Sequence, residues 1–193
     1  MSTQATQKIE ALESGDDHPP EGFRAADAGS GYASRNARFY AKWQDDRLLL
    51  GFRVTQHHTN LRNVLHGGML ATFADTVLPY SAMYQALNGR HFLPTISLQI
   101  DYLAPAAIGA WVQGQADVLR TTRNMVFMQG LVTADDVAIA RLHGLRPPVR
   151  CGRRRLGRGH GVEANSIHSG AASRARADRV LPRKDLITPL NFL

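Results

Sequence analysis

Two kinds of apolar run follow one another along this chain. Short runs rich in β-branched and aromatic residues predict strands, and they cover residues 39–43, 48–55, 95–102, 111–119, 125–133 and 138–142. Between the second and third lies a longer run, from Gly67 to about Ala86, whose lack of a polar face predicts a helix wrapped by other structure. An antiparallel sheet folded around one helix satisfies this order, so the pattern predicts an α+β fold.

The two ends of the chain lack this patterning. Residues 1–33 are rich in Ser, Gly, Ala, Asp and Pro, and we expect them to form a flexible leader ahead of a single domain at 34–144. Residues 145–193 mix Arg, Gly, Ala and Ser and bury too little apolar surface to offset the entropy of ordering. We therefore predict a disordered tail.

The formal net charge of +7 comes from this tail. Residues 145–193 hold 11 Arg or Lys against 3 acidic residues, whereas residues 1–144 hold 12 against 13. Phe192 is the one aromatic residue of the tail, so the tail carries charge without a platform on which bases stack. We interpret it as a solvated extension, and we expect no nucleic-acid binding beyond non-specific contact.

Composition also limits location and metal binding. No apolar run approaches the roughly 18 residues of a membrane span, and the N-terminus lacks the basic and apolar segments of a secretory signal. We therefore expect a cytoplasmic protein without membrane contact. Cys151 is the single cysteine, which excludes an internal disulfide and a multi-cysteine metal site, and we expect no metal.

The helical run begins with His66-Gly67-Gly68 and carries one carboxylate, Asp75. A helix start presents backbone N–H groups without intrahelical acceptors, and two glycines would let an oxyanion approach these amides. The same glycines also fit a tight strand-to-helix turn. Asp75 lies in an apolar segment, where it is either a structural carboxylate bonded to its surroundings or a general base strengthened by burial.

Spacing constrains how these two groups act together. Gly67 and Asp75 are eight positions apart, or roughly 12 Å along one helix. A reacting carbonyl cannot lie about 3 Å from the first while its attacking water is held by the second. If both act on one substrate, the carboxylate comes from a second subunit whose helix runs antiparallel to the first. The sequence thus predicts a dimer with two interfacial sites.

Two spaced motifs run through the domain, and they are Asn60-x5-His66-Gly67-Gly68-x6-Asp75-Thr76 and Thr95-x6-Tyr102-x2-Pro105-x3-Gly109. Their combination resembles the PaaI-like branch of the hotdog-fold acyl-CoA thioesterases, over residues 39 to 142. The resemblance implies an antiparallel sheet wrapped around a long central helix, dimers with a continuous sheet, and often tetramers. It also implies hydrolysis of acyl-CoA or aryl-CoA thioesters without a metal or cofactor, coenzyme A being part of the substrate.

Roles are carried over by position. The resemblance implies that the Gly67 amide is the oxyanion donor and that Asp75 of the partner chain is the general base or nucleophile. Asn60 and His66 would support the thioester carbonyl, and Thr95 would help to hold the attacking water. Each of these three also fits a structural role: a turn residue, a helix-entry hydrogen bond and an ordinary strand residue, respectively.

Substrate contacts are less specific. Gly68 belongs to the helix start, and Arg62 stands close before it. Arg120 and Arg123 flank a predicted turn, where they would bind the phosphates of coenzyme A. A solvated turn explains these arginines as well.

Three departures from the family pattern concern the backbone. Asn63 stands where the family often has Gly, and Asn tolerates a left-handed conformation. Pro79 lies inside the helix, where it deletes the N–H that would bond the Asp75 carbonyl and should produce a kink. The last strand loses its usual ending after Arg141, and the abrupt change of composition suggests the hypothesis that residues 145–193 are translated in a changed reading frame.

Two other functions stay open at this stage. Hotdog hydratases and dehydratases typically need an Asp and His dyad on a loop before the helix, whereas this chain places its acid inside the helix. A non-catalytic acyl-CoA-binding module would keep the fold without the reaction.

Overall fold

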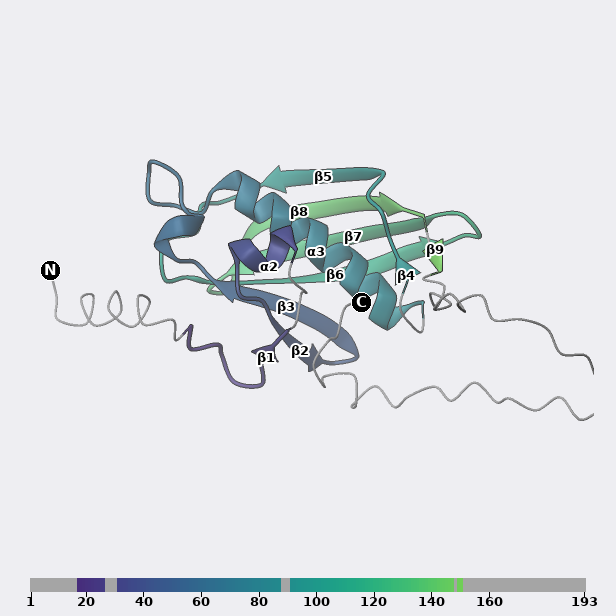
Figure 1. Ribbon diagram of the computed structural model, residues 1–193, viewed down its shortest axis with the longest axis horizontal. Coiled ribbons are helices and arrows are strands. Elements are labelled where there is room, and N and C mark those ends of the chain that lie inside the picture. The colour runs from purple at the N-terminus through teal and green to yellow at the C-terminus, as the bar shows by residue number, and fades with distance from the viewer. Residues whose placement is uncertain (1–16, 27–30, 88–90, 148, 151–193) are drawn as a thin grey trace, which may run out of the picture.

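The computed structural model describes residues 17–26, 31–87, 91–147 and 149–150, and the fold is built on one helix held in one sheet (Figure 1). Helix α3 (Gly67–Gln85) runs across a seven-stranded antiparallel sheet. In spatial order the strands are β1 (Arg24–Ala25), β2 (Tyr40–Gln44), β3 (Arg47–Arg53), β6 (Trp111–Thr121), β7 (Val126–Ala134), β8 (Val137–Arg146) and β5 (Ser97–Tyr102). The predicted α+β hotdog arrangement is confirmed.

Two short helical elements and a small second sheet complete the described part of the chain. They are α2 (Tyr32–Asn36), the 3-10 turn η1 (Gln56–His58), and the two-stranded pair of β4 (His91–Phe92) with β9 (Val149–Arg150). Two hairpins turn at aspartate pairs. Asp45 and Asp46 join β2 to β3, and Asp135 and Asp136 join β7 to β8, all four with positive φ. Such left-handed pairs match the twist of the strands that they connect.

The core lies between α3 and the inner face of the sheet. Phe73, Val77 and Leu78 of the helix are fully buried, and they pack among inward-facing residues of β3, β6, β7 and β8. Gly144 of β8 permits close approach, since a Cβ added there would lie 2.6 Å from Leu78 Cδ1. The sheet thus covers most of the helix, which explains why its sequence has almost no polar face.

The end of the last strand differs from the expectation. β8 continues past Arg141 to Arg146, and it is paired on both sides, with Leu145 opposite Ser97 of β5 and Arg146 opposite Val126 of β7. The expected loss of the strand after Arg141 is therefore wrong. The sequence is misleading here because Arg146 adjoins the Arg-rich residues of the predicted tail, although it takes an inward-facing position of the strand.

The expected boundaries of the domain also shift. Arg24 and Ala25 pair with β2, and the ring of Phe23 lies 5.0 Å from that of Trp111 in an edge-to-face contact. Part of the predicted leader is therefore built into the sheet, and at the other end β8 passes residue 144. Residues 1–16 and 151–193 lie outside the described residues. Most of the predicted tail belongs to this part of the chain, as do most of the residues that the reading-frame hypothesis concerns.

Among the residues that the structure describes, no helix has both the length and the apolar character needed to cross a membrane.

Substitution of Gly144 by Ala tests the close packing of helix on sheet. The added methyl group would have to displace Leu78, whose side chain is fully buried. Overpacking of this kind typically costs about 1–3 kcal/mol, and urea denaturation should report a loss of that size in the free energy of unfolding. Gly31→Ala is the matched control, since nothing lies within 4 Å of its added Cβ. Equal stabilities of the two variants would contradict the packing described here.

Candidate active site

Helix α3 begins with an ordered turn at His66. The backbone of His66 is extended (φ −67°, ψ 133°), and its Nδ1 accepts a hydrogen bond of 2.8 Å from the N–H of Gly68. The N–H of His66 donates to the carbonyl of His58 at 2.8 Å. The helix-entry hydrogen bond expected for His66 is therefore present. Among the hydrogen bonds of the described residues none uses the N–H of Gly67, which stays available to a ligand.

Strand β5 and the segment after it hold this helix start in place. The hydroxyl of Tyr102, in β5, donates to the carbonyl of Gly67 at 3.0 Å. The N–H of Leu65 donates to the carbonyl of Ala106 at 2.8 Å. The position of the Gly67 amide is thus fixed from both sides by tertiary contacts.

Asp75 lies on the strip of α3 that the sheet leaves open. Its side chain is 50% exposed in the single chain, so the expected burial in apolar surroundings is not found there. The reason is the helical period, which turns Asp75 away from its neighbours Ala74 and Thr76, both buried against the sheet. Thr95, in the connection before β5, donates its hydroxyl to Asp75 Oδ1 at 2.7 Å.

Arg146 completes this cluster. Its side chain is only 2% exposed, and its Nη2 lies 2.6 Å from the same Oδ1 of Asp75. Its Nη1 donates to the hydroxyl of Thr95. Sequence reasoning missed Arg146, although one signal was present: counted along β8 with a period of two, it falls in the same row as the buried residues Leu142 and Ala140.

The comparisons with known proteins agree on one family. Residues 62–140 match the family model described as Thioesterase superfamily. Over these residues the chain is similar to the thioesterase superfamily. This match supports an enzyme of thioester hydrolysis, and it agrees with the resemblance to PaaI-like hotdog thioesterases.

Relatives in sequence are named for ester or thioester hydrolysis, and a solved structure shares the fold. A Pseudomonas aeruginosa protein that is named as an esterase, PA0474, is 26% identical over 127 residues, which are 65% of this chain and 94% of that one. Acyl-coenzyme A thioesterase 13 of Mus musculus is 27% identical over 82 residues, which are 42% of this chain and 57% of that one. The structure of a mutant of the phenylacetic acid degradation protein PaaI from Thermus thermophilus has a TM-score of 0.50 at 21% identity, covering 60% of this chain and 96% of that one.

A tight turn lies shortly before the first residue of α3. The side-chain oxygen of Asn60 accepts a hydrogen bond of 2.9 Å from the N–H of Arg62, and its carbonyl accepts one from Asn63. Asn63 has a φ of 56°, so the left-handed conformation expected of it is present. Asn60 thus acts as a turn residue in the single chain. It lies with Arg62 and His66 around a shallow depression beside the helix start.

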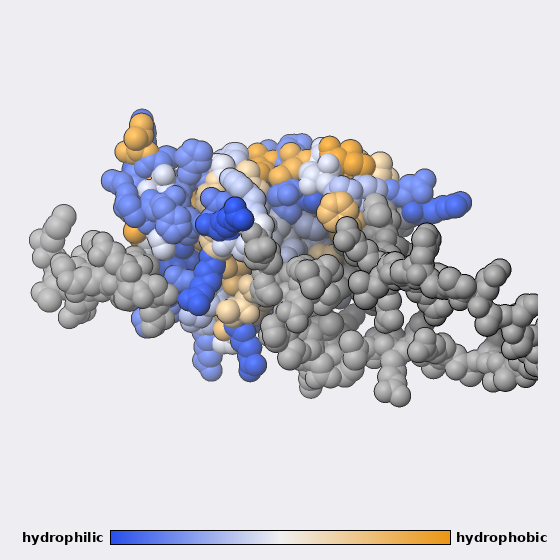
Figure 2. All heavy atoms as spheres, viewed as in Figure 1, coloured by the Kyte–Doolittle hydropathy of each residue, from blue (hydrophilic) through white to orange (hydrophobic). Residues whose placement is uncertain are grey.

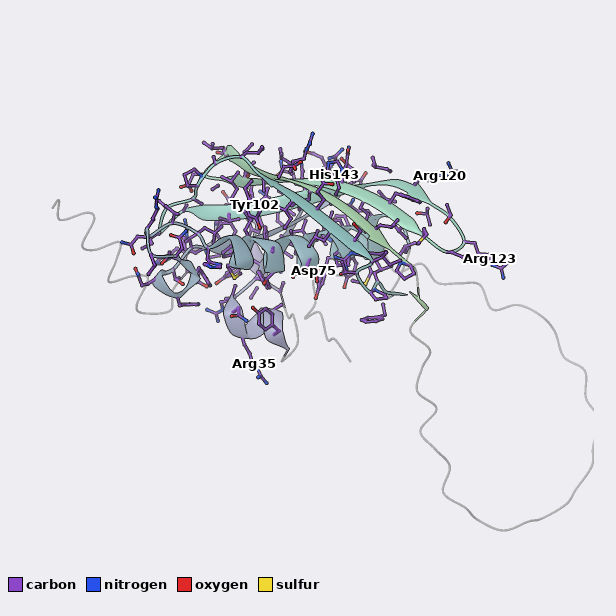
Figure 3. The ribbon with its side chains drawn as sticks, turned by 90° about the horizontal axis from the view of Figure 1, so that it is seen from above. Arg35, Asp75, Tyr102, Arg120, Arg123 and His143 are labelled. Atoms are coloured by element: carbon purple, nitrogen blue, oxygen red, sulfur yellow. The ribbon has the colours of Figure 1, made fainter. Side chains whose placement is uncertain are left out.

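The two other arginines predicted to bind phosphate, Arg120 and Arg123, do not lie at the helix start. Arg120 is the penultimate residue of β6, Arg123 lies in the turn to β7, and both are exposed. Figure 3 shows them at the far end of the hairpin, with Asp75 between them and Tyr102. Within one chain they are therefore not brought together with Gly67. Among the described residues no group of three or more His, Cys, Asp or Glu side chains is placed to hold a metal ion.

His58 supports the start of α3, because its main-chain carbonyl accepts the hydrogen bond from the N–H of His66. Its ring is buried, with Nδ1 accepting a hydrogen bond from the N–H of Thr55 at 3.0 Å and Nε2 lying 2.6 Å from the carbonyl of Asn36, to which it donates in this tautomer. Burial lowers the pKa of His58 below its usual 6.5. The unfolded chain therefore binds this proton at a higher pH than the folded chain.

Stability should consequently depend on pH through His58. Its contribution is fully present above about pH 6.5, the unfolded pKa, and is lost as the pH falls below that value. Urea denaturation at pH 7.5 and pH 5 should show a larger loss for the wild type than for His58→Gln. The neighbouring exposed His57 supplies the control. His57→Gln should keep most of the wild-type pH dependence, because burial is the largest cause of the lowered pKa of His58 and the charge of His57 is a smaller one. If His58→Gln lost as much stability as the wild type between pH 7.5 and pH 5, the pH dependence could not be assigned to His58.

Proposed function

We propose that this thioesterase hydrolyses acyl-CoA or aryl-CoA thioesters to the free acid and coenzyme A, in a site shared by two protomers. The observation that carries the proposal is the separation of two reactive groups along α3. Its first residue, Gly67, offers a free N–H, and its one exposed carboxylate, Asp75, stands two turns further on. The two groups are roughly 12 Å apart along the helix axis. One thioester can meet both only if they come from different chains.

The helix start supplies the electrophilic half of the site. In the proposed reaction the thioester oxygen accepts a hydrogen bond from the N–H of Gly67, which is aligned with the positive end of the helix dipole. The absence of a side chain at Gly67 lets the substrate approach the backbone closely. As the tetrahedral intermediate forms, negative charge develops on that oxygen, and the fixed amide stabilises it more than it stabilises the ground state.

Asp75 of the partner supplies the other half. Oδ1 is occupied by Thr95 and Arg146, whereas Oδ2 makes no hydrogen bond with the described residues. Oδ2 is thus the oxygen that takes a proton from water or attacks the thioester carbon itself. In the first route water adds to the carbonyl and the thiolate of coenzyme A leaves. In the second route an anhydride forms with loss of the thiolate, and water then hydrolyses it.

A second protomer has a natural place against β5. This strand is at the edge of the seven-stranded sheet, so its outer side is open to another strand. Apolar side chains gather over this border of the molecule in Figure 2, and Ile96 and Leu103, which flank β5, are more than half exposed. Pairing of β5 with its counterpart would bury them and form a continuous sheet. This surface supports the proposed dimer, and a dimer of dimers would need a second contact surface.

The choice of coenzyme A rests on similarity and on charge. The mouse relative is named for acyl-coenzyme A. Arg120 and Arg123 lie on the same side of Tyr102 as Asp75 (Figure 3), where we assign them to the phosphates of the nucleotide, with Arg62 and Gly68 at the helix start of the other protomer. A screen of short, medium, branched and aromatic acyl-CoAs would identify the preferred acyl group.

Replacing Asp75 by Asn tests the catalytic carboxylate. The variant keeps the shape of the side chain and loses its charge, so kcat for thiol release should fall by about 10²–10⁴-fold. Asp117→Asn is the control, because Asp117 is also a half-exposed carboxylate beside an arginine, 3.1 Å from Arg47. It should leave kcat unchanged. An active Asp75→Asn enzyme would refute the proposal.

Replacing Gly67 by Pro tests the oxyanion donor. Proline is well tolerated at the first position of a helix, and the extended backbone of His66 suits a residue before proline. The change therefore removes the N–H with little effect on the fold, and kcat should fall by about 10²–10³-fold. Gly67→Ala keeps the N–H, and its Cβ would meet Tyr102 at an ordinary 3.5 Å. Similar kcat values for the Pro and Ala variants would rule out the Gly67 amide as the donor.

A further inference from the structure

The guanidinium of Arg146 has an unusual environment for a charged group. It faces inward from β8, in the same row as Leu142, and its side chain is almost completely buried. A buried charge is costly unless it is paired and hydrogen-bonded. Its two terminal nitrogens are fully used, but its Nε has no hydrogen-bond partner among the described residues. The buried charge is therefore stabilised by the hydrogen bonds of the two terminal nitrogens.

One of these nitrogens holds Asp75 at two points. Nη2 of Arg146 lies 2.6 Å from Oδ1 of Asp75 and 3.2 Å from the main-chain carbonyl of the same residue. That carbonyl would normally accept the N–H of the residue four positions later, which is Pro79 and has none. The proline inside the helix thus releases the acceptor that Arg146 uses. Its effect is local, because α3 continues through Pro79 to Gln85.

The other nitrogen orders the loop that carries Thr95. Nη1 donates to the carbonyl of Leu93 at 2.9 Å and to the hydroxyl of Thr95. Thr95 in turn donates to Asp75 Oδ1. Both contacts to the carboxylate therefore converge on Oδ1, and the side chain is turned so that Oδ2 is left free.

We propose that Arg146 is the positioning residue of the active site, which fixes Asp75 and Thr95 together and directs Asp75 Oδ2 to the thioester, and that Pro79 is required for this grip. This inference rests on the proposed function, since it takes Asp75 to be the reacting carboxylate. Arg146 itself does not touch the substrate.

Arg146→Lys is the first test. Lysine keeps the charge but cannot reach two oxygens of Asp75 and the Thr95 loop at once. We expect kcat to fall by about 10–100-fold, as misplacement of a reacting group by about 1 Å can do, while KM changes less than about twofold. Arg141→Lys is the control, because Arg141 lies on the same strand as Arg146 and forms an exposed ion pair of 2.8 Å with Asp101 of the neighbouring strand β5. It should leave both constants unchanged.

The same change in an Asp75→Asn background separates positioning from general damage. If Arg146 acts through the carboxylate, Arg146→Lys should lower the residual kcat of Asp75→Asn by less than about twofold. An equal loss in both backgrounds, or a shift in Tm without a loss of kcat in the wild-type background, would overturn the inference. Loss of kcat in Asp75→Asn with full kcat in Arg146→Lys would remove the inference alone. Full kcat in Asp75→Asn would instead remove the proposed function.

Pro79→Ala keeps the proposal testable even if Arg146 variants fold poorly. Alanine favours the helix and restores an N–H that competes for the Asp75 carbonyl. We expect Tm to rise while kcat falls several-fold, two effects that general damage to the fold would not combine. A rise in Tm with unchanged kcat would overturn the role assigned to Pro79, and unchanged kcat in both Pro79→Ala and Arg146→Lys would overturn the whole inference.

Discussion

The burial of helix α3 inside one antiparallel sheet is the constraint on which the rest of the molecule depends. The helix is apolar on nearly every side, and Phe73, Val77 and Leu78 are removed from solvent completely. Removing this much apolar surface from water is the main stabilising term of the fold. Because the strands cover most of the helix, the strip that contains Asp75 and the helix start at Gly67 are the parts left for chemistry. The position of the site therefore follows from the packing of the core.

Within this frame the polar groups are tied to one another. Arg146 is buried and needs an anionic partner, and Asp75 is the carboxylate that the open strip presents to it. Thr95 joins the two, and the carbonyl released by Pro79 adds a second anchor on the helix backbone. At the other end of the helix, Tyr102 and His66 fix the glycine turn. Both halves of the proposed site are thus held by contacts made before any substrate arrives, which is what preorganised catalysis requires.

The sequence was sufficient for the fold, and it placed Gly67 at the start of the central helix and Asp75 within it. The unbroken apolar run after His66 predicted the helix, and the short β-rich runs predicted the strands, because both signals are local. Arg146 was not found, since its role depends on Asp75, 71 positions earlier in the chain, and a single arginine after a strand looks like the start of a basic tail. For the same reason the last strand was ended too early. The exposure of Asp75 also escaped prediction, because the apolar neighbours on either side of it point in other directions.

The central claim is that each active site takes Gly67 from one protomer and Asp75 from the other, and subunit complementation tests it most directly. Asp75→Asn and Gly67→Pro chains, each inactive alone, are co-expressed and the mixed dimers assayed for thiol release. In a mixed dimer one site contains both intact residues and the other contains neither. If the account is right, random mixing restores roughly a quarter of the wild-type activity, since half of the dimers are mixed and each has one working site. A mixture no more active than its parents would show that the two residues do not act across the interface.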